Sequence, residues 1–119
     1  MALRWLDQDP SCVEDWVVHR PPDHWLRQPM LLLGGWWDPH LLGILDLWRR
    51  SIAVGGTPQI HIGPASHLEW WSGAQTLLME FFYTPLKGIQ TSKATPAMQL
   101  WNLTSQTWQR PEPSSRISW

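Results

Sequence analysis

Two short apolar segments and the amphipathic segment between them dominate the hydrophobic pattern of the chain. The first is the uninterrupted apolar run 30–33, which lies between a proline and a pair of glycines. A short run with such borders predicts a strand buried on both faces. The second, 59–62, contains two isoleucines and ends at a Gly-Pro pair, so we predict a second strand there.

The segment between these strands has the period of a helix. Its apolar positions lie at spacings of four, three and four residues: Leu41, Leu45, Trp48 and Ile52. One apolar stripe of this kind predicts an amphipathic helix, and Gly55-Gly56 is expected to end it. A strand, a helix and a strand in this order predict two parallel strands joined by a right-handed crossover.

The rest of the chain gives weaker patterns. A second long helix is predicted from Gly73 to about Tyr83, with Pro85 expected to stop or kink it. A short helix is predicted within 11–18 from a capping-box pattern. The loose alternation from Ala97 to Trp108 predicts a β segment.

These elements predict an α/β fold with three parts. Residues 1–28 form an irregular segment, 29–88 a βαβα unit with parallel strands, and 89–119 a linker followed by a short β segment. A parallel unit of two strands needs neighbouring strands and helices to cover it. We therefore expect a partner chain or self-association to cover the incomplete sheet.

Composition narrows the classes of partner. The chain has 119 residues and a formal net charge of −1, which gives no electrostatic reason to expect nucleic acid or an anionic membrane. No apolar stretch approaches the ~20 residues that span a bilayer, and the first residues do not resemble a signal peptide. The single cysteine, Cys12, excludes an internal disulfide and favours a cytoplasmic location. No cofactor is predicted.

The candidate chemistry lies where the two predicted strands end. Asp38 follows the first strand and His67 follows the second, 29 residues later. Each has a simple structural interpretation, since Asp38 before Pro39 suits a helix N-terminus and a loop histidine is often a surface residue. Together they favour catalysis, because consecutive parallel strands bring their carboxyl-end turns to one sheet edge. There a carboxylate can orient an imidazole that accepts a proton.

Two other candidates are set aside. His19, Asp23 and His24 lie in a proline-broken segment without the spacing of a metal site, so no metal is predicted. Ser66 precedes His67 directly and is a candidate nucleophile. Neighbouring residues on one loop, however, rarely reach the geometry that nucleophilic attack requires.

Several motifs resemble one family of enzymes. The segments Gly34-Gly35-Trp36-Trp37-Asp38-Pro39 and Gly63-Pro64-Ala65-Ser66-His67 resemble the CocE/NonD hydrolases, which are X-Pro dipeptidyl-peptidase-like α/β hydrolases. The segment 19–25 is similar to the family's segment before the acid, which would make 1–28 cap-derived. The run 98–108 resembles the start of its C-terminal jelly-roll domain.

This resemblance implies a serine hydrolase of esters or X-Pro-type amides. Asp38 would be the triad acid and His67 the general base. Trp36 and Trp37 would line the acyl or leaving-group pocket, although a packing role suits them equally well. The family's usual Trp and Thr before the histidine are Ala65 and Ser66 here, which changes the expected pocket shape.

The nucleophile is missing from the predicted triad. No Gly-x-Ser-x-Gly sequence occurs in the chain, and too few residues precede Asp38 to hold the strands that normally carry it. We therefore expect a fragment of a hydrolase of small acyl esters or peptides that is inactive alone. Two alternatives stay open: a non-catalytic interaction module, suggested by eleven tryptophans, or half of a split hydrolase that receives its serine from another chain.

Overall fold

The computed structural model describes residues 19–87 and 97–111, together with residues 7, 9, 11, 12 and 14. Their elements follow the order α2 (Asp23–Leu26), β1 (Leu31–Gly35), α3 (Leu41–Ala53), β2 (Gln59–Gly63), α4 (Ala74–Lys87), β3 (Met98–Asn102) and β4 (Thr107–Gln109). They form a small mixed α/β structure, as predicted. Most of the predicted helix at 11–18 lies outside the described residues, as does the linker at 89–96.

One sheet of four strands organises the described residues, in the order β1-β2-β3-β4. β1 pairs with β2 in parallel, which confirms the predicted pairing, and β3 extends the sheet in parallel beyond β2. β4 is antiparallel to β3. β3 and β4 thus share a sheet with β1 and β2, and the start of a jelly-roll domain in this part of the chain stays a prediction.

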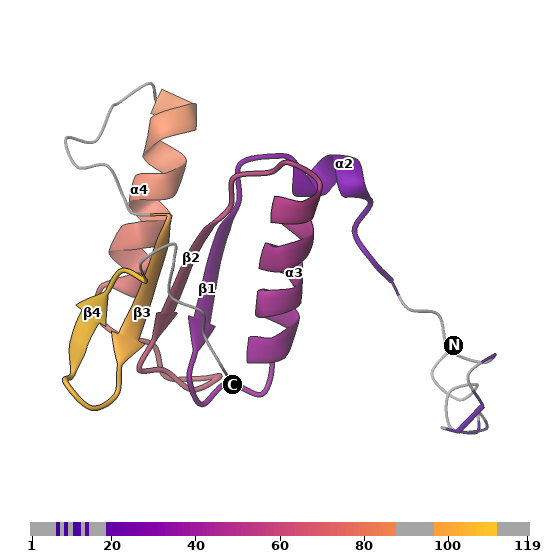
Figure 1. Ribbon diagram of the computed structural model, residues 1–119, viewed down its shortest axis with the longest axis horizontal. Coiled ribbons are helices and arrows are strands. Elements are labelled where there is room, and N and C mark those ends of the chain that lie inside the picture. The colour runs from indigo at the N-terminus through magenta and orange to yellow at the C-terminus, as the bar shows by residue number, and fades with distance from the viewer. Residues whose placement is uncertain are drawn as a thin grey trace.

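The core lies between the sheet and α3. Leu32, Ile60 and Ile62 are buried at its centre, and the partly buried side chains around them include Leu41, Ile44, Leu45, Leu47, Trp48, Met98 and Leu100. The predicted stripe of α3 is mostly confirmed, although Ile52 at its end is about half exposed. Figure 1 shows α3 on one side of the sheet and α4 on the other.

Two local features differ from the sequence prediction. The segment before β1 contains α2, whose Leu26 is buried and whose carbonyl accepts a hydrogen bond from the buried Ser51 hydroxyl of α3. α4 continues to Lys87, so Pro85 does not stop the helix, and the other expectation, a kink at Pro85, stays a prediction. Pro85 lies in the last turn, where a lost hydrogen bond to Phe81 interrupts little of the remaining helix.

Among the described residues, no helix is long and apolar enough to cross a membrane.

Candidate active site

The turns after β1 and β2 are joined by main-chain hydrogen bonds. The N–H of Trp36 donates to the carbonyl of Gly63, and the N–H of Trp37 donates to the carbonyl of Ala65, both at 3.1 Å. Gly35 lies so close to Ala65 that a side chain at position 35 would overlap the Ala65 carbonyl. The turn that carries Asp38 is therefore fixed against the loop that carries His67. Figure 1 shows that the carboxyl ends of both strands lie at the end of the sheet where α3 begins.

Asp38 is held by the turn in which it lies. Its N–H donates to the carbonyl of Gly35 at 3.1 Å, and its Oδ1 accepts the N–H of His40 at 2.8 Å. Its side chain is only 4% exposed. The hydrogen bond from His40 lowers the pKa of Asp38 below its ordinary value, against the opposing effect of burial, and His67 lowers it further. A buried carboxylate is thus kept ionised at the sheet edge.

His67 lies beside this carboxylate. Its Nδ1 is 3.5 Å from Oδ1 of Asp38, and its side chain is 58% exposed. The loop is stabilised by a hydrogen bond from the N–H of Ser66 to the carbonyl of Glu69 at 3.0 Å and by one from the N–H of Glu69 to the Ser66 hydroxyl at 3.3 Å. The structure thus brings the predicted acid and the predicted base together, with the carboxylate buried and the imidazole open to solvent.

The two tryptophans of the acid turn differ in their surroundings. The indole N–H of Trp36 donates to the carbonyl of Trp101 at 2.7 Å, and its ring packs against the core. Trp36 also lines a groove of about 740 Å³ between α3 and β3. Trp37 is 61% exposed. Their predicted role in a substrate pocket stays a prediction.

His40 is the neighbour of this pair that sequence analysis did not single out. Its ring centroid lies 4.9 Å from that of His67, at an interplanar angle of 58°. Asp38, His40 and His67 each offer one potential ligand atom, and these atoms lie within 4.8 Å of one another. The signal in the sequence was the position of His40 two residues after the candidate acid. This spacing alone does not indicate that His40 lies beside His67, because their proximity depends on the conformation of the turn.

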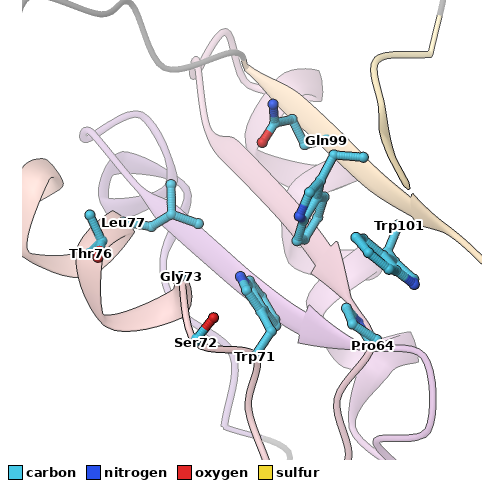
Figure 2. Close-up of a pocket in the computed structure, with 9 residues that line it drawn as sticks. Pro64, Trp71, Ser72, Gly73, Thr76, Leu77, Gln99 and Trp101 are labelled. Carbon is cyan, nitrogen blue, oxygen red and sulfur yellow. The ribbon is translucent and has the colours of Figure 1, made fainter. Parts of the chain in front are cut away.

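A second hollow lies on the opposite face of the sheet. It has a volume of about 460 Å³, and Figure 2 shows Trp71, Gln99 and Trp101 among the side chains around it. Gln99 is the neighbour of His61 in the register of β3 and β2, and His61 is fully buried without a hydrogen-bond partner for either ring nitrogen. Burial lowers the pKa of His61, with an opposing effect of Gln99, which favours a neutral imidazole.

One comparison with known proteins gives a result. The family model described as X-Pro dipeptidyl-peptidase (S15 family) matches residues 1–69, a range that includes α2, β1, α3, β2 and both site turns. No curated protein and no solved structure matches the chain.

Proposed function

Since the chain belongs to the X-Pro dipeptidyl-peptidase (S15) family, we propose that it is the part of a serine hydrolase that carries the triad acid and the general base. The substrates would be small acyl esters or X-Pro-type peptides. The observation that carries this proposal is the meeting of Asp38 and His67, 3.5 Å apart, at the ends of two adjacent parallel strands.

Each residue has a role in such a mechanism. The carboxylate of Asp38 holds the His67 imidazole in one orientation and stabilises the positive charge that forms when it is protonated. His67 takes the proton of the attacking serine hydroxyl and later returns it to the leaving group. The buried position of Asp38 supports this assignment, because a fixed, ionised carboxylate can orient its partner without rearranging.

We propose that the nucleophilic serine comes from outside these 119 residues, because none of the serines in the sequence lies in a Gly-x-Ser-x-Gly context. In the described part of the chain β1 pairs only with β2, so the other edge of β1 can accept a further strand. If such a strand ran parallel to β1, its carboxyl end would lie at the same end of the sheet as Asp38. The βαβ unit would then be one section of an α/β-hydrolase sheet.

The hydrolysis of a p-nitrophenyl ester tests this function. The purified chain alone should give no turnover above that of the His67→Ala variant. If the upstream reading frame encodes a Gly-x-Ser-x-Gly strand, adding that second chain should restore turnover that His67→Ala and Asp38→Asn abolish. Turnover by the chain alone that His67→Ala removes would show that the nucleophile is internal. If no combination is active, the hydrolase assignment is wrong.

The second candidate function is a non-catalytic interaction module. It is supported by strongly exposed apolar side chains, such as Leu42 at 79% and Leu68 at 87% exposed. Surfaces of this kind often mark places where another protein binds. A chain that stays strictly monomeric in sedimentation and binds no partner would contradict this alternative, whereas restored ester hydrolysis would favour the first.

A further inference from the structure

The cluster of Asp38, His40 and His67 has a composition that the hydrolase mechanism does not explain. A triad uses one carboxylate and one imidazole, and here a second imidazole lies beside them, with the His40 and His67 rings 4.9 Å apart. We propose that these three side chains bind a divalent zinc-type cation, with a fourth position open to water.

The distance between the acid and the base supports this site. An N–H···O hydrogen bond has a usual length of about 2.7–3.2 Å, and the separation of 3.5 Å between Nδ1 of His67 and Oδ1 of Asp38 is longer. Two ligands that each lie about 2.0–2.1 Å from a tetrahedral zinc ion are roughly 3.3 Å apart. The observed spacing is therefore close to that of two ligands around one cation.

The cluster combines one fixed ligand with two adjustable ones. Asp38 is nearly buried and its turn is fixed by hydrogen bonds, whereas His40 and His67 are both exposed. The ligand atoms lie within 4.8 Å of one another, so the exposed imidazoles would have to move inward to bring all three to the roughly 3.3 Å spacing of ligands on one zinc ion. The adjacent N-terminus of α3 opposes a cation, and we therefore expect weaker binding than at a closed site with four protein ligands.

The donor set selects the class of cation. Two imidazoles and one carboxylate suit zinc and its neighbours in the first transition row, whereas magnesium and calcium prefer oxygen ligands alone. Three protein ligands with one open position match the usual coordination of an accessible zinc ion.

This site would regulate the reaction if the proposed function holds. A His67 nitrogen that is bound to a cation cannot accept the proton of a serine, so zinc would inhibit hydrolysis by removing the general base. Zinc binding itself requires no nucleophile. Zinc binding to the chain can therefore be measured whether or not the chain has a role in hydrolysis.

Calorimetric titration of Zn²⁺ into the full chain tests the proposal. We expect one ion per chain, and His40→Ala and His67→Ala should each weaken binding at least tenfold. His24→Ala and Cys12→Ser are the matched controls, and each should change the affinity less than twofold. His24→Ala removes an exposed imidazole outside the cluster, and Cys12→Ser removes the only thiol of the chain. Zn²⁺ should also raise the melting temperature of the wild type but not that of His40→Ala.

Several outcomes would overturn the site. These are the absence of binding, an equal loss of affinity in the His24→Ala and His40→Ala variants, or displacement of Zn²⁺ by an equal concentration of Mg²⁺. Substitution of Co²⁺ gives a further readout, since its visible absorption should change on binding to the wild type and should not change with His40→Ala.

Discussion

At the scale of single residues, the Asp38 side chain contributes both to the turn after β1 and to the candidate site. Its carboxylate accepts the N–H of His40, which fixes the start of α3, and it also lies beside the His67 imidazole. Both contacts favour the ionised form, so folding and site chemistry depend on the same charge.

A pH dependence of stability follows from this charge. The pKa of Asp38 in the folded chain lies below its ordinary value of 3.8, chiefly because of the hydrogen bond from His40. A lowered folded-state pKa contributes stability that is complete above the unfolded value and is lost as the pH falls through the folded value. The wild type should therefore exceed Asp38→Asn in stability by a constant amount above about pH 4 and by less below it.

Urea unfolding of both proteins between pH 2 and pH 7 measures this difference. The difference in unfolding free energy between the wild type and Asp38→Asn cancels the contributions of the other carboxylates. One of these is Asp9, whose pKa is also lowered by hydrogen bonds from Ser11. A difference that stays constant down to pH 2 would show that Asp38 does not carry this effect.

At the scale of elements, the site depends on how closely the end of β1 approaches the loop after β2. Main-chain hydrogen bonds from Trp36 and Trp37 join the two turns, and the absence of a side chain at Gly35 allows the approach. The close contact is with main chain, which cannot move aside as a flexible side chain could.

Two glycine substitutions separate this packing requirement from helix propensity. Gly35→Ala should lower the free energy of unfolding by about 1–3 kcal/mol, because the new methyl group overlaps the Ala65 carbonyl. Gly43→Ala, on the exposed side of α3 with nothing within 4 Å, should instead raise it by about 0.5–1 kcal/mol. Urea denaturation followed by circular dichroism measures both changes, and equal effects of the two variants would contradict the role of Gly35.

At the scale of the whole molecule, the described residues expose apolar surface on the α3 side of the sheet. The groove between α3 and β3 is lined mainly by apolar side chains, and Leu42 at its rim is 79% exposed. Such surface favours association because burying it removes apolar area from water.

Self-association through this groove gives a testable difference between two leucines. Leu42→Gln should weaken association by roughly ten- to a hundredfold, since burying one leucine contributes about 1.5–3 kcal/mol. Leu86→Gln is the matched control, because Leu86 is 76% exposed on α4 and lies outside the groove. Sedimentation velocity at several concentrations measures both, and a strictly monomeric wild type would contradict the expected association.

The sequence alone determined the elements around the site and the order in which they occur. The apolar run before Gly34, the stripe beginning at Leu41 and the isoleucines of 59–62 predicted β1, α3 and β2. These signals are local, because the periods of strands and helices and the effects of glycine and proline act over a few residues. The same locality placed Asp38 and His67 at the ends of parallel strands.

Only the tertiary structure decided how these residues meet and what else lies beside them. The distance between Asp38 and His67, the position of His40 next to both and the burial of His61 depend on strand register and loop packing between segments far apart in the chain. The addition of β3 to the parallel sheet also required long-range pairing, which alternation within 97–108 could not specify. Contacts of this kind arise when many weak preferences are satisfied together, so no local pattern records them.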